Sequence, residues 1–164
     1  MNAASDSRRL RLLLLTLAVL TIVLLWTSVE DQSTFVRIGG LSLFVILNTV
    51  TIVRVLWRVL LAPDVTFDIL CASIALYLLI GTTWTLSYIV LDILNPDAFK
   101  LISMTAEKGW TEFLYFSFAT LTTLGYCDIS PSAAFVRIWA VMEAVTGVLY
   151  LAILVARLVS LYRT

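Results

Sequence analysis

Long apolar runs constrain the fold of this chain more than any other feature of its sequence. A helix needs about 20 mostly apolar residues to cross a lipid bilayer, and runs of about that length occupy residues 12–29, 36–61, 67–94 and 133–162. The chain is 61% hydrophobic and only 13% charged, whereas soluble domains average about 45–50% apolar and about 25% charged residues. We therefore expect an all-α membrane protein with four transmembrane helices.

The first apolar run has two interpretations. Its basic start at Arg8, Arg9 and Arg11, followed by apolar residues, also fits a cleaved signal peptide. The run is longer than the usual apolar part of a signal peptide, and no clean cleavage site follows it. We expect a retained helix that pairs with the second run in a transmembrane hairpin, residues 1–64, and the cleaved signal stays as the alternative.

A shorter apolar and aromatic segment, residues 110–122, separates the third and fourth runs. It follows a turn signal at Asn95, Pro96 and Asp97 and a more polar stretch at residues 98–109. Apolar segments of about 10–14 residues are typical of re-entrant or interfacial elements. We therefore expect a short helix that enters the membrane without crossing it.

Basic residues indicate the orientation, because the side of a membrane protein with more Lys and Arg faces the cytoplasm. With four spans, one side carries most of the arginines: Arg8, Arg9, Arg11, Arg54, Arg58, Arg157 and Arg163. The other side has as its only bases Arg37, Lys100, Lys108 and Arg137. We therefore expect both termini in the cytoplasm and the segment after residue 122 on the outer side of a cell membrane.

Charge and residue types argue against several classes of function. The formal net charge is zero, so the chain lacks the basic patch that nucleic-acid binding requires. Histidine, the commonest metal ligand and general base, is absent, and the two cysteines, Cys71 and Cys127, lack zinc-site spacing. We therefore expect neither an enzyme nor a bound cofactor.

The segment after the short helix reads "LTTLGYCDI", residues 121–129. Non-helical backbone at membrane depth is tolerated only where it is buried in protein or lines water. A row of backbone carbonyls that faces an axis can replace the hydration shell of a cation. The segment is therefore a candidate cation filter.

This segment resembles the potassium-channel signature TTVGYGD. The match covers "TTLGYCD", residues 122–128, with Leu124 in place of Val and Cys127 in place of Gly. The context of a short aromatic helix, Pro131 and a long last span is also similar. The resemblance implies a pore domain at residues 65–164, made of outer helix, re-entrant pore helix, filter loop and inner helix, and it implies a homotetramer.

The resemblance also implies roles for individual residues. The filter that binds K⁺ would consist of Thr123, Leu124, Gly125, Tyr126 and Cys127, and the residues supporting it would be Thr122, Asp128, Tyr115 and Glu143. Tyr115 would donate a hydrogen bond to Asp128. Glu143 is interpreted as a brace for the pore helix, with a protonated acid or an ion site as alternatives. Gly147 occupies the position of a gating hinge, and a packing glycine is the equal alternative.

Cys127 is the departure from the signature that bears most on function. A filter backbone alternates between right- and left-handed conformations, and a Cβ in the left-handed region costs about 1–2 kcal/mol. We expect two left-handed positions, Gly125 and Cys127, and strain at the second that turns the last carbonyl away from the pore axis. The predicted function is passive K⁺ transport across a bacterial inner membrane. The alternatives are a weakly selective or non-conducting channel-like protein and a membrane scaffold or accessory subunit.

Overall fold

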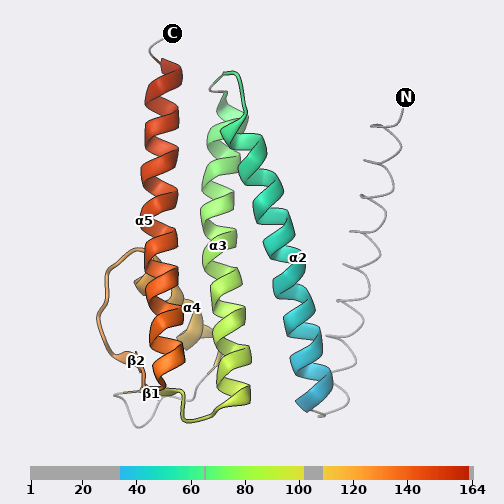
Figure 1. The fold of residues 1–164 in the computed structure, drawn as a ribbon, viewed down its shortest axis with the longest axis vertical. Helices are drawn as coiled ribbons and strands as arrows, with labels where there is room; N and C mark the ends of the chain where they lie inside the picture. The colour runs from blue at the N-terminus through green and yellow to red at the C-terminus, as the bar shows by residue number, and fades with distance from the viewer. Residues whose placement is uncertain (1–33, 65, 102–108, 163–164) are drawn as a thin grey trace.

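Three long helices dominate the fold. The computed structural model describes residues 34–64, 66–101 and 109–162, and the long helices are α2 (Thr34–Leu60), α3 (Phe67–Leu94) and α5 (Ala134–Tyr162). They run alongside one another, with α3 between α2 and α5 (Figure 1). Their bounds agree closely with the second, third and fourth apolar runs. The expected first span, residues 12–29, lies outside the described residues.

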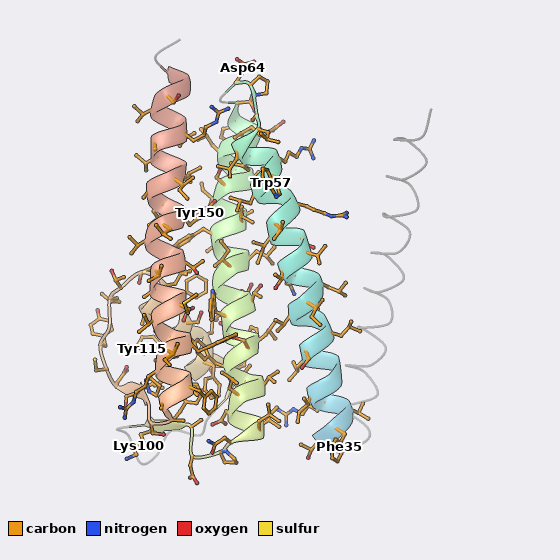
Figure 2. The ribbon with its side chains drawn as sticks, viewed as in Figure 1. Phe35, Trp57, Asp64, Lys100, Tyr115 and Tyr150 are labelled. Carbon is orange, nitrogen blue, oxygen red and sulfur yellow. The ribbon has the colours of Figure 1, made fainter. Side chains whose placement is uncertain are left out.

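All three long helices are long and apolar enough to cross a membrane. Large apolar side chains such as Phe35 and Trp57 project from them into the surroundings (Figure 2). Phe67 is also exposed. A soluble protein could not expose so many large apolar side chains without aggregating. The chain is therefore a mostly helical, multi-pass membrane protein.

A short helix and a strand pair fill the segment between α3 and α5. Helix α4 (Trp110–Leu121) lies beside the lower half of α5 in Figure 1. Strands β1 (Phe99–Leu101) and β2 (Ile129–Pro131) pair antiparallel, with Lys100 opposite Ser130. The expectation of a purely helical chain missed this strand pair, because three-residue strands carry no recognisable periodicity. The pair joins the two ends of the segment that contains α4 and the following loop.

Aromatic packing holds α4 against α3. The Tyr88 ring of α3 meets the Phe116 ring of α4 edge-on, with centroids 5.0 Å apart. Phe99 of β1 packs in the same edge-on way on Phe113 at 5.1 Å, a geometry that aromatic pairs favour. A second buried cluster, with Leu76, Leu121 and Tyr150, continues the contact between α3, α4 and α5.

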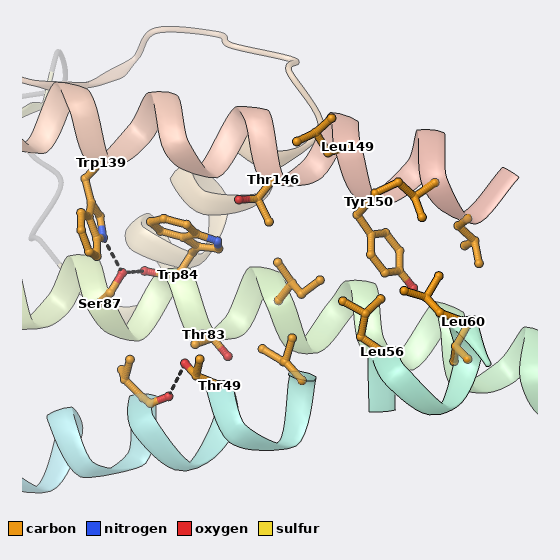
Figure 3. A pocket seen from close by; sticks show the side chains of 16 residues that line it. Thr49, Leu56, Leu60, Thr83, Trp84, Ser87, Trp139, Thr146, Leu149 and Tyr150 are labelled. Carbon is orange, nitrogen blue, oxygen red and sulfur yellow. Dashed lines mark hydrogen bonds between the residues drawn. The ribbon is translucent and has the colours of Figure 1, made fainter. Parts of the chain in front are cut away.

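An apolar groove of about 420 Å³ remains open between α2, α3 and α5 (Figure 3). Leu56 and Leu60 of α2 line one side, and Tyr150 of α5 lines the other. At one end the Trp139 indole donates a hydrogen bond of 3.2 Å to the Ser87 hydroxyl, which joins α5 to α3. Because this groove separates α2 from α5, helix α2 contacts mainly α3.

Gly147 is the point of closest approach between α5 and α4. A Cβ built on Gly147 would lie 2.1 Å from the carbonyl oxygen of Leu121, in the last turn of α4. Because that oxygen belongs to the backbone, it cannot rotate out of the way. Gly81 of α3 has a similar role, since a Cβ there would lie 2.6 Å from the Phe118 ring of α4.

We predict that Gly147→Ala destabilises the protein and that Gly39→Ala does not. The added methyl of Gly147→Ala forces α5 away from α4, and overpacking of this kind costs about 1–3 kcal/mol. Gly39 lies in α2 with no atom within 4 Å of a built Cβ, so alanine there should stabilise the helix by about 0.5–1 kcal/mol. Thermal unfolding in detergent measures both effects, and equal melting temperatures for the two variants would contradict the proximity of α4 and α5.

Candidate functional site

The candidate site is the loop that follows α4. This helix has 12 residues, and its first turn is closed by a hydrogen bond of 3.1 Å from the Gly109 N–H to the Glu112 carboxylate. Its last turn ends at Thr122, whose N–H and hydroxyl donate to the Phe118 carbonyl at 3.0 and 2.6 Å. Thr122, expected to close this helix, is its C-cap residue.

The first N–H groups of the loop fold back onto the end of α4. The Thr123 N–H donates to the Thr120 carbonyl at 2.9 Å. The N–H groups of Leu124 and Gly125 both donate to the Ala119 carbonyl, at 2.8 and 3.1 Å. The last carbonyls of a helix have no partner within it, so this arrangement uses them and fixes the loop to the helix.

The carbonyl side of the loop is largely free. Within residues 123–127, four carbonyl oxygens accept no hydrogen bond from any described residue: those of Thr123, Leu124, Tyr126 and Cys127. The side chains around them are exposed, with Leu124 at 56% and Tyr126 at 65% of their full accessible area. Inside a membrane such carbonyls require water or an ion as a partner.

The backbone of the loop is left-handed at every second residue. The φ angles are 58° at Thr123, 60° at Gly125 and 62° at Cys127. Alternation of hand turns successive peptide planes so that their carbonyls face the same side. The sequence led us to expect two left-handed positions, and the structure has a third at Thr123, whose hydroxyl donates to the Thr122 carbonyl at 2.7 Å.

Cys127 keeps the left-handed conformation in spite of its Cβ. Its φ of 62° matches that of Gly125 within 2°, so this expected position is left-handed, and the turning of its carbonyl away from the pore axis stays a prediction. The Cys127 thiol lies 3.3 Å from the Gly125 carbonyl and donates to it. The cysteine therefore occupies one carbonyl of the row, and the strain of a left-handed side chain stays in the loop.

Tyr115 of α4 contacts two residues of the loop. Its ring stacks on the Tyr126 ring, with centroids 6.4 Å apart and planes 10° from parallel. Its hydroxyl faces Asp128 closely enough to interact with it, and the hydrogen bond that the sequence suggested between the two stays a prediction. A cavity of about 190 Å³ lies between this part of the loop and α4, next to the small side chain of Ala119.

Glu143 of α5 is fully buried against α4 and α3. Its carboxyl oxygens lie 2.5 Å from the Ser117 hydroxyl of α4 and 2.6 Å from the Tyr88 hydroxyl of α3. The structure thus places Glu143 beside the short helix, in contact with Ser117. Sequence reasoning missed Ser117 and Tyr88, although a buried acid in an apolar span calls for hydroxyl donors on the neighbouring helices.

Gly147 lies inside one continuous helix that runs from Ala134 to Tyr162. Its contact with Leu121 favours the packing interpretation of this glycine, and the gating hinge stays a prediction. Among the described residues, no group of three or more His, Cys, Asp or Glu side chains gathers in a metal site. Cys71 and Cys127 are both free and exposed.

We predict that Tyr115 holds the loop through both of its contacts. Tyr115→Phe removes the hydroxyl that interacts with Asp128 and keeps the ring stack, whereas Tyr115→Ala removes both. Amide hydrogen exchange of residues 123–128 should become several-fold faster in the first variant and faster still in the second, because local opening becomes easier. Unchanged exchange in Tyr115→Ala would show that the loop is held by its backbone contacts to α4 alone.

Comparison with known proteins identifies the family. A protein-family model described as "Ion channel" matches residues 65–164, which are more than half of the 164 residues of the chain. Neither the curated proteins nor the solved structures gave a match. The matched region contains α3, α4, the loop with its free carbonyls, and α5. The chain therefore belongs to the ion channel family, and its function is the transport of ions across a membrane.

Proposed function

We propose that the chain is a subunit of a potassium-selective channel and that residues 123–127 form its filter. The observation that carries the proposal is a row of carbonyls of which, among the described residues, only that of Gly125 accepts a hydrogen bond, on a backbone that is left-handed at Thr123, Gly125 and Cys127. Carbonyl rows of this kind replace the hydration shell of K⁺ and let ions pass by knock-on between adjacent sites. No chemical reaction is involved, so the chain acts as a passive pore.

The exposed filter supports a symmetric homotetramer. One loop presents carbonyls to an ion from one side only, whereas filters are built from rings of carbonyls contributed by four such loops. Apolar residues of α5 such as Val148, Leu151 and Val155 are also exposed, and they are available to contact neighbouring subunits and lipid. In the tetramer α4 is the re-entrant pore helix, and its C-terminal end supplies a negative dipole that favours a cation.

The arrangement of basic residues supports an orientation in which the C-terminal ends of α2 and α5 face the cytoplasm. The end of α2, which carries Arg54 and Arg58, and the end of α5 lie at the same end of the molecule (Figure 1). Arg157 of α5 donates a hydrogen bond of 2.8 Å to the Ala62 carbonyl at that end. By the positive-inside rule this end faces the cytoplasm, as do both termini if residues 12–29 form a fourth span. The proposal places the channel in a bacterial inner membrane, with residues 1–64 as an accessory hairpin and residues 65–164 as the pore domain.

A weakly selective or non-conducting pore is the second candidate. The observation that favours it is the hydrogen bond from the Cys127 thiol to the Gly125 carbonyl, because a carbonyl held by a thiol is less available to K⁺. The left-handed Cβ of Cys127 adds strain of about 1–2 kcal/mol in each subunit. Both effects act at the outer end of the proposed filter.

We predict that Cys127→Gly increases selective K⁺ flux into proteoliposomes. Glycine removes the thiol and the strain, and relief of about 1–2 kcal/mol corresponds to about a 5–30-fold change in the population of a competent filter. Cys71→Ala is the matched control, since Cys71 is the other free cysteine and lies in α3. Na⁺ flux is measured in parallel.

The outcomes separate the candidates. Higher K⁺ flux in Cys127→Gly with little Na⁺ flux supports the selective channel, and K⁺ and Na⁺ flux of equal size in both forms supports the weakly selective pore. Absence of K⁺ flux in both forms, with tetramers present in the same vesicles, would overturn the proposal of a conducting channel.

A further inference from the structure

Each of the short oxygen–oxygen contacts around Glu143 needs a hydrogen atom between its two oxygens. Glu143, Tyr88 and Ser117 are all fully buried. Three contacts join them and one backbone carbonyl: Tyr88 hydroxyl to Glu143 at 2.6 Å, Glu143 to Ser117 hydroxyl at 2.5 Å, and Ser117 hydroxyl to the Gly81 carbonyl at 2.8 Å. Two oxygens at these distances attract each other only when a hydrogen lies between them.

The hydrogens that these groups carry decide the protonation state of Glu143. A serine or tyrosine hydroxyl supplies one hydrogen each, and a backbone carbonyl supplies none. The contact with Gly81 therefore uses the hydrogen of Ser117, and the contact of Tyr88 uses its own. The remaining contact, between Glu143 and Ser117, needs a third hydrogen, which only a protonated carboxyl group provides. With an ionised carboxylate, three short contacts would have to share two hydrogens.

The surroundings of Glu143 agree with this count. In the described part of the chain Glu143 forms no ion pair, and a buried carboxylate without a cation is expensive. The titratable groups that face it are both tyrosines of α3, Tyr88 and Tyr77. Helix α4 presents Ser117, an uncharged hydroxyl. Nothing in this set stabilises a negative charge beyond the hydrogen bonds themselves.

We propose that Glu143 is held as a neutral carboxylic acid that donates its proton to Ser117. The hydrogen bonds then run in one direction, from Tyr88 to Glu143, from Glu143 to Ser117 and from Ser117 to the Gly81 carbonyl. This chain joins α5, α4 and α3, so the proton of Glu143 is a structural element that positions α4. Loss of the proton leaves α4 without this donor and places an unpaired charge between the three helices.

Three substitutions at buried and partly buried acids test the proposal. Glutamine at position 143 supplies the same pattern as a neutral acid, with an oxygen that accepts from Tyr88 and an NH₂ group that donates to Ser117. Leucine at the same position supplies neither. Glu112→Gln changes a partly buried glutamate of α4 that accepts from the Gly109 N–H and serves as the control. Near pH 7 we expect Glu143→Gln to melt at the same temperature as the unsubstituted protein and Glu143→Leu to melt roughly 5 °C lower.

Infrared spectroscopy of the protein in lipid vesicles reads the protonation state directly. The unsubstituted protein should show the C=O band of a protonated carboxylic acid near neutral pH. This band should disappear in Glu143→Gln and persist in Glu112→Gln. Absence of the band from the unsubstituted protein, or a loss of melting temperature in Glu143→Gln as large as in Glu143→Leu, would overturn the proposal.

The pH profile of stability gives a second readout that a simple packing residue would not change. The folded protein keeps a proton that an exposed glutamate releases above about pH 4.3, so a rise in pH favours the unfolded chain. The melting temperature of the unsubstituted protein should therefore fall relative to that of Glu143→Gln between about pH 5 and pH 9, a range below the usual tyrosine pKa of about 10. Parallel profiles for the two proteins would contradict the neutral acid.

We also expect the protonation of Glu143 to affect ion flow, because the filter loop is attached to the end of α4. This expectation rests on the proposed function. K⁺ flux of the unsubstituted protein should decline toward alkaline pH while that of Glu143→Gln stays level. Level flux in both, together with the expected infrared and melting results, would remove the link to conduction and leave the neutral acid in place. Absence of K⁺ flux at every pH would count against the proposed function alone.

Discussion

Close packing of helix α4 between α3 and α5 positions the loop that follows it. This helix is too short to be fixed by the membrane, so its neighbours must hold it. Gly147 of α5 and Gly81 of α3 allow close approach on two sides, and Ser117 connects α4 to Gly81 and to Glu143. Small residues and hydroxyl groups are the usual means of joining helices in lipid, where the hydrophobic effect does not favour contact between them.

Hydrogen bonds to the end of α4 shape the loop that follows it. The N–H groups of Leu124 and Gly125 both use the Ala119 carbonyl, which leaves the opposite edge of the loop to present its carbonyls. Tyr115, one turn earlier in α4, contacts Tyr126 and Asp128 on the far part of the loop. A shift of α4 would therefore move every carbonyl of the proposed filter together.

Cys127 has the left-handed backbone conformation that is usually found at glycine. Cys127 is left-handed in the loop, although glycine is the residue that most readily adopts this conformation. The thiol then turns onto the Gly125 carbonyl. The proposed filter is thus formed, with its outer end altered both in strain and in the number of carbonyls open to an ion.

The amino-acid sequence alone was enough to predict the membrane class, the bounds of α2, α3 and α5, and the place of a short helix before the loop at residues 122–128. These features follow from the length and spacing of apolar runs, which act locally and depend little on the rest of the chain. The loop was also found from sequence, because its letters resemble a known signature. Its third left-handed position at Thr123 was not.

How these parts meet depends on packing between segments that are distant in the chain. The strand pair of Phe99–Leu101 with Ile129–Pro131 joins residues that are distant in the chain and too few to show a pattern. The contact of Gly147 with Leu121, and the chain of hydroxyl groups around Glu143, depend on which faces of three helices come together. A sequence records which residues are small or polar, but the choice among many possible helix contacts is made by packing of the whole molecule, because each contact is stable only when the others are in place.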